Sequence, residues 1–464
     1  MRKSLQLSNT IERMERFYSN KYGLISFLGT SKQSKLIVAT KECNYMVGNV
    51  IPIFRTNAIV DSKRLGKDCT ELLEGEIGPE SGFAVSLSLT RSRVKAIGEF
   101  IERYCAVREE NECVEKTLFD SYNNLLEKGV SCIKPETLIQ FEDNHYDNPK
   151  FAYKQYFDDC FISWIEGTNL VMDEKVWLPI QKVFTCYPFH QKEECYISGI
   201  STGLACGSNY YQAVLGGIYE VVERDSFMLT WLLKLPGKCI EVDYVSNEEL
   251  RALYRHILRY LVGEDQLYIY DISKTEGIYT ILTFIRNNLH YAHGLVVAAA
   301  SHTNPEIALL KALEEVCQIQ QLAYYNLISD NVDGVGNLRK EDVDTLVKHC
   351  LYYNTGRRSC NIDFISFTKE SISLSELRSY STGSEENDLE YVLNLFCQKK
   401  QMVYVADITK PEISEQGFHV VKAIIPSYFD LETQYCLRVS KNERLKMFQQ
   451  ESDSEINEEP HPFS

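Results

Sequence analysis

The second half of the chain alternates between short runs of β-branched and aromatic residues and longer runs with apolar residues at helical spacing. Three short runs have the composition of strands: residues 266–272 (QLYIYDI), 279–286 (YTILTFIR) and 294–302 (GLVVAAASH). The segment 303–328 has helical periodicity, with Asn304 as the expected N-cap and Pro305 at the first helical position. This alternation of strands and helices predicts a mixed α/β fold.

The same alternation continues towards the end of the chain. An amphipathic helix is predicted over residues 389–400, with strands over residues 401–409 and 419–426. The polar stretch 371–388 predicts a surface insertion, and the acidic stretch 451–464 a flexible segment until its last few residues. We divide the chain into an N-terminal region of unassigned role packed on the core (residues 1–80), a core (81–430) and a C-terminal segment (431–464).

Two helical segments carry the same acidic motif, Glu-x-x-Glu-Arg. Its members are Glu99, Glu102 and Arg103 within residues 91–107, and Glu220, Glu223 and Arg224 within residues 210–231. Side chains three or four residues apart lie on one helical face, so each glutamate pair forms a stripe. A third helix aligns Lys311, Glu315 and Gln318 in the same way.

Each acidic stripe has two interpretations. Exposed like charges on a helix cost only a few tenths of a kcal/mol, so one motif alone is more typical of a solvated surface. The helix around Glu220, however, is too apolar to leave much of its surface exposed. Buried carboxylates about 5–6 Å apart would repel by roughly 3 kcal/mol, and they therefore require cations. Magnesium prefers oxygen ligands and recruits phosphates, whose charge Arg103 and Arg224 could meet, so the three helices together favour a nucleotide–metal site.

Glycines accompany the second motif. Gly216 and Gly217 lie inside the predicted helix, where each costs about 1 kcal/mol relative to alanine. They indicate that a ligand or another helix approaches the backbone closely. Gly203 and Gly207 precede the helix, where they either form turns or cradle an anion at its N-terminus.

Composition narrows the class of protein. The 464 residues have a net charge of −16, which argues against nonspecific nucleic-acid binding. No stretch approaches the roughly 18–20 apolar residues that cross a bilayer, and the N-terminus lacks a signal-peptide pattern. The 15 cysteines include no C-x-x-C pair, so no structural zinc site is expected. Together these features predict a cytoplasmic protein that binds neither membranes nor nucleic acid.

Three segments, AIGEFIERY, GLACGSNYYQAVLGGIYEVVERDSF and NPEIALLKALEEVCQ, resemble in order and spacing the three ATP-binding motifs of the YcaO family. The resemblance extends from about residue 80 to at least 320, and we extend it to about 430. It implies the YcaO-type ATP-binding α/β fold, with mixed sheets and helix-borne glutamates that hold Mg-ATP, and makes residues 81–430 the catalytic core. By position it implies ATP binding by Lys95, Glu99, Glu102, Arg103, Glu220, Glu223, Arg224, Glu315 and Gln318, with Glu99, Glu102, Glu220 and Glu223 as Mg²⁺ ligands.

The ending PHPFS resembles the proline-rich C-terminus of YcaO cyclodehydratases, which reaches the active site. The resemblance implies catalytic roles for Pro462 and for the C-terminal carboxylate of Ser464 in proton transfer. The chain also departs from the family pattern. A glycine-lysine-glycine run upstream of the first helix is absent, and Lys95 replaces a serine. Lys311 and Gln320 stand where arginines are common, and Ser464 stands where proline is usual.

The resemblance implies an enzyme that uses ATP to cyclise Cys, Ser or Thr residues of a ribosomally made precursor peptide into thiazolines or (methyl)oxazolines, as in bacteriocin or toxin maturation. It implies an E1-like partner protein that binds the leader peptide, and allows a flavin-dependent dehydrogenase and a homodimer. Three alternatives stay open. These are thioamide or amidine formation at the same ATP site, a non-catalytic YcaO-like scaffold, and an unrelated acidic metal-binding protein.

Overall fold

The structure is a computed structural model. It describes residues 27–32, 36–38, 46–48, 51, 53–59, 81–108, 117–149, 151–190, 192–261, 265–286, 294–329, 338–353, 356–435 and 441–463. The α-helices are α2 (Leu89–Ala106), α3 (Tyr122–Glu127), α4 (Ile180–Val183), α5 (Tyr210–Leu232), α6 (Glu248–Tyr260), α7 (Pro305–Ser329), α9 (Leu346–Tyr352), α10 (Glu385–Gln398), α11 (Pro411–Ser414) and α12 (Glu443–Ser452).

The strands are β1 (Phe27–Lys32), β2 (Leu36–Val38), β3 (Met46–Gly48), β4 (Phe54–Ile59), β5 (Ser81–Ser86), β6 (Thr117–Ser121), β7 (Phe161–Asn169), β8 (Glu174–Pro179), β9 (Leu204–Gly207), β10 (Lys238–Glu241), β11 (Gln266–Asp271), β12 (Tyr279–Arg286), β13 (Leu295–His302), β14 (Ser371–Ser373), β15 (Tyr404–Asp407) and β16 (His419–Ile424). In the described residues they form a three-stranded sheet (β1-β4-β5), a five-stranded sheet (β13-β12-β11-β10-β14) and a six-stranded sheet (β6-β7-β15-β16-β9, with β8 on β7), while β2 pairs with β3.

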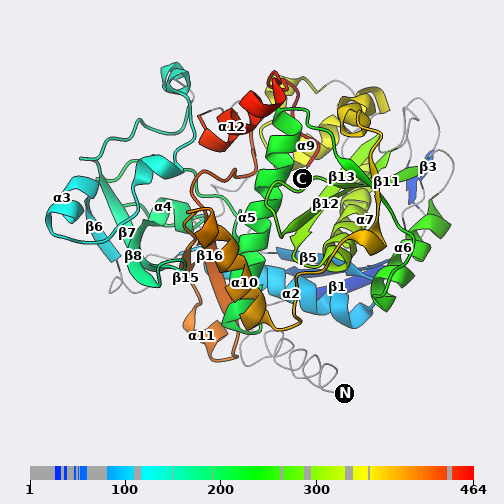
Figure 1. Cartoon of the computed structure of the whole chain (residues 1–464), viewed down its shortest axis with the longest axis horizontal. Coiled ribbons are helices and arrows are strands. Elements are labelled where there is room, and N and C mark those ends of the chain that lie inside the picture. Colours follow the sequence, from blue (N-terminus) through cyan, green and yellow to red (C-terminus); the bar gives the residue numbers. More distant parts are fainter. Residues whose placement is uncertain are drawn as a thin grey trace.

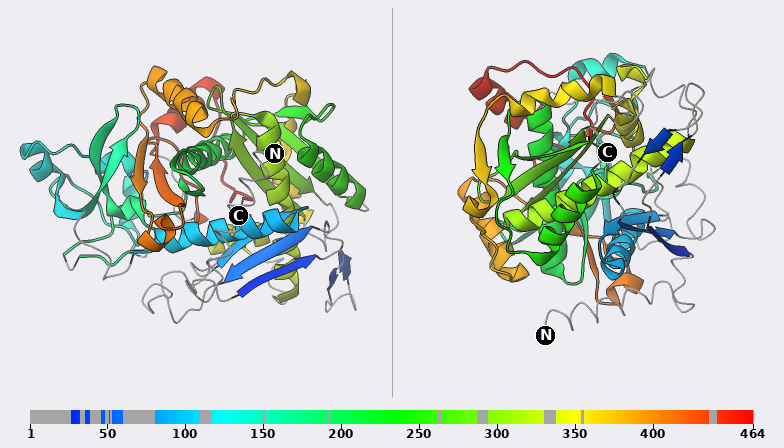
Figure 2. Two further views of the ribbon diagram at one scale, coloured as in Figure 1. Left: turned by 90° about the horizontal axis from the view of Figure 1, so that it is seen from below. Right: turned by 90° about the vertical axis from the view of Figure 1, so that its right-hand side faces the viewer.

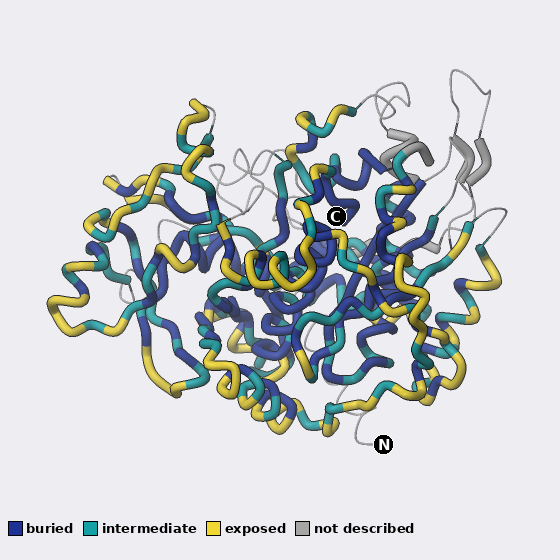
Figure 3. The backbone as a smooth tube through the Cα atoms, turned by 45° about the horizontal axis from the view of Figure 1, so that its top comes forward, coloured by how far each residue is buried: buried dark blue, intermediate teal, exposed yellow. Residues whose placement is uncertain are grey.

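Helix α5 lies at the centre of the molecule, between the five-stranded and the six-stranded sheets (Figure 1). It packs against β9 and β16 on one side and against β13 on the other. Most of its residues are buried, because apolar side chains surround the helix on nearly every face. Buried residues accordingly concentrate around this helix and the strands beside it (Figure 3).

Two further helices complete the interior. Helix α2 lies across β5 and β4 of the three-stranded sheet and also contacts β9, while α7 covers β12 and β13 (Figure 2). Strands β1 and β4 belong to the same sheet as β5, and β5 directly precedes α2 in the sequence. Helices α2, α5 and α7 each pack on a different sheet or sheet face. Since they lie far apart in the sequence, the side chains between them come from three distant parts of the chain.

The mixed α/β fold with several sheets is confirmed, and the predicted strands and helices occur within a few residues of their expected bounds. The cap of α7 is as expected: Asn304 Oδ1 accepts a hydrogen bond from Glu306 N at 2.9 Å, and Pro305 is the first helical residue. Five strands match the sequence prediction: β11, β12, β13, β15 and β16.

One expectation at the periphery is wrong in part. The stretch 371–388 is not a surface insertion throughout, because β14 pairs in parallel with β10 and Leu374 is buried. A single buried leucine is not visible in the polar composition of the whole stretch. The acidic stretch near the C-terminus is bound to α5 from Asn457 onward, where the backbone N of Asn457 donates to Leu232 O at 2.7 Å.

The glycine pair of α5 faces a sheet, so the expectation of a ligand or a neighbouring helix was wrong. A Cβ at Gly217 would lie 2.7 Å from Gly203 O and 3.0 Å from the Ala423 Cβ. A Cβ at Gly216 would lie 3.0 Å from the Ala205 Cβ. The absence of these side chains lets α5 approach β9 and β16, which sets the position of Glu220 and Glu223 further along the helix.

Candidate functional site

The predicted site residues of α2 lie where the helix faces β5 and α5. Arg103 Nη2 donates to Glu99 Oε1 at 2.6 Å, and the other oxygen of Glu99 accepts from Phe83 N at 2.6 Å. Burial raises the pKa of Glu102 well above its usual value, and the carboxylates of Glu220 and Glu99 raise it further. Arg103 is thus engaged by Glu99, and Glu102 lies beside a carboxylate of another helix.

The predicted residues of α5 form the middle of the site. Glu220 Oε2 accepts from Gly203 N at 3.1 Å, and its other oxygen lies 3.5 Å from Arg224 Nη2. Burial raises the pKa of Glu220 and raises that of Glu223 well above its usual value. Arg224 opposes the rise at Glu223, whereas Glu315 and Glu220 add to it.

Helix α7 supplies the third side. Burial raises the pKa of Glu315 to about 7, and Glu220 and Glu99 contribute to the rise against Arg224 and Lys95. Gln318 lies three residues further along α7, on the same face. Lys311, also on α7, is exposed to solvent. The structure therefore brings glutamates from α2, α5 and α7 into mutual electrostatic contact.

This cluster has more carboxylates than the nearby cations can satisfy. Three glutamates have strongly raised pKa values because of burial and of one another: Glu102, Glu223 and Glu315. Arg224 is the guanidinium at their centre, and its Nη1 is buried with no hydrogen-bond partner among the described residues. A buried guanidinium nitrogen without a partner fits a phosphate anion, and buried carboxylates with raised pKa values fit a cation.

The carboxylates do not form a closed metal cage. Among the described residues, no three His, Cys, Asp or Glu side chains converge tightly enough to bind a metal ion by themselves. Magnesium commonly takes one or two protein carboxylates and completes its coordination with water and substrate phosphates. The donor set thus fits a Mg²⁺ ion that arrives with a nucleotide.

Lys95 of α2 pairs with a carboxylate of α7. Its Nζ lies 2.9 Å from Glu314 Oε2 on α7, and Arg91 Nη2 lies 3.5 Å from the same oxygen. Glu314 is buried. It lies outside the stripe formed by Lys311, Glu315 and Gln318, so helical periodicity did not single it out. The pair ties α2 to α7 beside the glutamates.

A second residue missed from sequence is Lys422 on β16. Its side chain is fully buried, and its Nζ donates to Ile200 O. Desolvation and Lys182 lower its pKa to about 7, against the opposing carboxylates of Asp430, Glu220 and Glu102. A lysine inside the apolar run HVVKAIIP was the signal that could have found it.

Several amides in and around the turn before α5 have hydrogen-bond partners. Gly203 has a φ of +89° and gives its N–H to Glu220. Ser208 N donates to Gln212 Oε1 at 2.8 Å, and Gln212 N to Asn209 Oδ1 at 2.9 Å. These contacts are those of a capped turn, and they support the turn interpretation of the glycines over the anion cradle.

The C-terminal segment returns to the middle of α5. Pro462 is buried, as is Phe463, whose ring centroid lies 4.5 Å from the Arg224 guanidinium carbon. Ser464 lies outside the described residues. The residues directly before it thus reach the site that contains Glu220 and Glu223.

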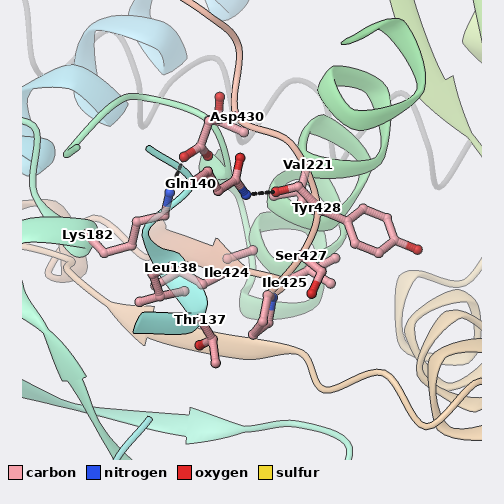
Figure 4. Close-up of a pocket in the computed structure, with 13 residues that line it drawn as sticks. Thr137, Leu138, Gln140, Lys182, Val221, Ile424, Ile425, Ser427, Tyr428 and Asp430 are labelled. Carbon is pink, nitrogen blue, oxygen red and sulfur yellow. Dashed lines mark hydrogen bonds and ion pairs between the residues drawn. The ribbon is translucent and has the colours of Figure 1, made fainter. Parts of the chain in front are cut away.

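A separate small pocket is lined by Val221 of α5 and by the residues at the end of β16 and just after it (Figure 4). Lys182 and Asp430 form an ion pair across it, and Gln140 Nε2 donates to Tyr428 O at 3.0 Å. The glutamates do not line this pocket. Its charged side chains are paired with each other, so the glutamate cluster is the better candidate for a nucleotide site.

Residues 85–428, about three quarters of the chain, match the family described as YcaO cyclodehydratase, ATP- and Mg²⁺-binding. The family match places this chain, with its mixed sheets around three glutamate-bearing helices, in a class of ATP- and Mg²⁺-binding proteins. The chain is a member of the YcaO family.

Solved structures share the fold at low sequence identity. A heterocyclase in complex with substrate and cofactor has a TM-score of 0.72 at 17% identity, covering 97% of this chain and 56% of that one. YcaO from Methanopyrus kandleri, bound with AMPPCP and Mg²⁺, has a TM-score of 0.60 at 18% identity over 91% of each chain. The Escherichia coli microcin synthetase McbBCD complex with pro-MccB17 bound has a TM-score of 0.53 at 16% identity, covering 87% of this chain and 88% of that one.

The first of these structures is much longer, and this chain spans only about half of its length. In the described part of the chain, no helix is both long and apolar enough to span a bilayer.

Proposed function

We propose that this chain catalyses ATP-dependent cyclodehydration of Cys, Ser or Thr residues in a ribosomally made precursor peptide. The observation that carries the proposal is the cluster of glutamates with raised pKa values around Arg224, which fits Mg-ATP. Support for ring formation comes from membership in the YcaO cyclodehydratase family and from the heterocyclase structure with the same fold.

The reaction joins a side-chain nucleophile to its own backbone. The Cys thiol, or a Ser or Thr hydroxyl, attacks the preceding amide carbonyl and forms a five-membered ring. ATP bound with Mg²⁺ supplies a phosphoryl group that makes the amide oxygen a leaving group. The oxygen departs as phosphate, so each ring formed removes the elements of one water from the peptide and releases ADP.

The chain's own residues would bind and orient these reactants. Glu99, Glu102, Glu220 and Glu223 are the candidates for Mg²⁺ ligands, with Lys95, Glu315 and Gln318 as further ATP contacts. Arg103 and Lys95 are already paired with Glu99 and Glu314. Arg224, whose Nη1 has no partner among the described residues, is therefore the cation best placed to take phosphate charge.

Two residues at the C-terminus have proposed catalytic roles. Pro462 and the carboxylate of Ser464 would assist proton transfer during ring closure. Support comes from the buried course of the segment up to Phe463, next to Arg224. We also infer a cytoplasmic location, because the proposed reaction consumes ATP.

The proposed reaction involves other proteins. We infer an E1-like partner that binds the leader of the precursor peptide, and a flavin-dependent dehydrogenase where azolines are oxidised to azoles. In support, a similar fold occurs in the microcin synthetase complex with pro-MccB17 bound.

Glu223→Gln tests the nucleotide site. The substitution keeps the shape of a buried side chain but removes a proposed Mg²⁺ ligand, so we expect an intact fold and Mg·ATP binding weakened at least tenfold, about 1.4 kcal/mol. Calorimetry with and without Mg²⁺ measures this, with thermal unfolding as the check on folding. Wild-type protein that binds no Mg·ATP, even with an E1-like partner added, would refute the enzymatic proposal and leave the scaffold.

Mass spectrometry of a precursor peptide then distinguishes the alternatives. Loss of one water for each Cys, Ser or Thr modified indicates azoline formation. Exchange of an amide oxygen for sulfur would instead identify thioamide formation at the same ATP site.

A further inference from the structure

The chain after α12 is bound along the C-terminal half of α5. Asn457 N donates to Leu232 O at 2.7 Å, and Asn457 Nδ2 donates to Trp231 O at 3.1 Å. Trp231 Nε1 in turn donates to Glu459 O at 3.0 Å. From this end of α5 the segment runs back towards Arg224, between α5 and β13 (Figure 1).

Contacts with other elements fix the last described residues. Tyr353 OH donates to Pro460 O at 2.6 Å, and the rings of His349 and His461 stack at 3.9 Å. Phe463 forms a parallel bridge with Val297 of β13 and is completely buried. Its aromatic ring therefore occupies a defined place in the interior.

That ring is the aromatic surface against Arg224. The guanidinium carbon lies 4.5 Å from the centroid of Phe463, which in turn packs on Phe227 with centroids 4.7 Å apart. The distance is well inside the range of a cation–π interaction, and the burial of both groups strengthens it.

The carboxylates beside Arg224 hold it less closely. Its nitrogens lie 3.5 Å from Glu220 Oε1 and 3.6 Å from Glu223 Oε1, whereas charge-assisted hydrogen bonds measure about 2.7–2.9 Å. Since Nη1 has no partner among the described residues, the carboxylates alone do not fix the plane of the guanidinium. The Phe463 ring supplies the missing restraint.

We propose that Phe463 is a positioning residue for the nucleotide site, whose ring orients Arg224 so that Nη1 stays available to a phosphate oxygen. This inference rests on the proposed function, because it requires Mg·ATP to bind beside Arg224. It makes docking of the C-terminal segment and binding of the nucleotide mutually dependent.

Phe463→Leu and Phe463→Met remove the ring while keeping most of its volume. We expect Mg·ATP affinity to fall about fivefold to thirtyfold in calorimetry, as for loss of a buried cation–π contact. Phe448→Leu is the matched control, because Phe448 lies against a different guanidinium, that of Arg444 at 5.6 Å, in the same C-terminal segment. We expect this control to bind Mg·ATP as the wild type does.

A double-mutant cycle with Arg224→Gln separates positioning from packing. If Phe463 acts through Arg224, Phe463→Leu will weaken Mg·ATP binding little further in the Arg224→Gln background. An equal loss in both backgrounds, unchanged affinity of Phe463→Leu, or unfolding of both Phe463 variants would overturn the inference. Wild-type protein without Mg·ATP affinity would instead refute the proposed function, so the two failures are distinguishable.

Discussion

Glu315 shows how single side chains in the cluster depend on their neighbours. Burial first, then Glu220 and Glu99, raise its pKa from 4.5 to about 7. Near neutral pH its carboxyl is therefore partly protonated, a state that an isolated glutamate does not reach. A cation placed among these carboxylates would favour their ionised forms.

We predict that Mg·ATP binding releases protons at pH 6. Affinity should rise with pH up to about 7 and level off above it, because an ionised Glu315 adds to the negative charge around the cation. Calorimetry in two buffers of different ionisation enthalpy measures the protons released. Glu315→Gln should release fewer, and an equal release would assign the effect to Glu102 or Glu223 instead.

The same shift has a consequence for stability without nucleotide. The folded-state pKa of Glu315 is raised, so its contribution is fully present below about 4.5 and is lost as pH rises through about 7. We expect Tm to fall across this window, and to fall less in Glu315→Gln. A pH profile identical in both proteins would contradict the assignment.

At the scale of elements, the close contact of α5 with β9 and β16 depends on its glycine pair. We predict that Gly217→Ala destabilises the protein by about 1–3 kcal/mol, although alanine is the better helix former by about 1 kcal/mol. The reason is that its methyl group would lie 2.7 Å from Gly203 O, a backbone atom.

Gly216→Ala is the control in the same helix. Its methyl group would meet only the Ala205 Cβ, at 3.0 Å, and should cost less in urea unfolding. A stabilising Gly217→Ala would show that α5 can move away from the sheet. The position of Glu220 relative to α2 would then not depend on this contact.

At the scale of the whole molecule, the C-terminal helix outside the family match at 85–428 is attached to the centre of α5. Arg444 of α12 binds Asp225 with Nη2 2.6 Å from Oδ2 and Nε 3.1 Å from both oxygens. Asp225 is fully buried and directly follows Arg224 in sequence. The pair thus links the C-terminal segment to the residue that carries the site's guanidinium.

Arg444→Ala should lower the free energy of unfolding by about 3–5 kcal/mol, because it leaves the Asp225 charge buried without a partner. Adding Asp225→Asn should restore part of the loss, since asparagine still accepts from Phe429 N. Arg339→Ala is the matched exposed control, with side chains of its pair 74% and 40% exposed, and should cost under about 1 kcal/mol. Equal losses at both sites would contradict this account.

The sequence by itself determined the mixed α/β fold, the approximate bounds of four helices (α2, α5, α7 and α10) and five strands (β11, β12, β13, β15 and β16), and the two Glu-x-x-Glu-Arg motifs. These follow from local periodicity, capping residues and the positions of like charges on a helical face. The resemblance to the YcaO family, now shown over residues 85–428, rested on those same motifs.

Only the tertiary structure decided which groups meet. Glu314 as the partner of Lys95, Lys422 near Glu220, and Phe463 over Arg224 join residues more than two hundred positions apart. The raised pKa values of the glutamates likewise depend on the tertiary structure, because burial and cross-helix repulsion exist only after α2, α5 and α7 have packed together. Local pattern places charges along a helix, whereas packing determines which charges are buried and what they face.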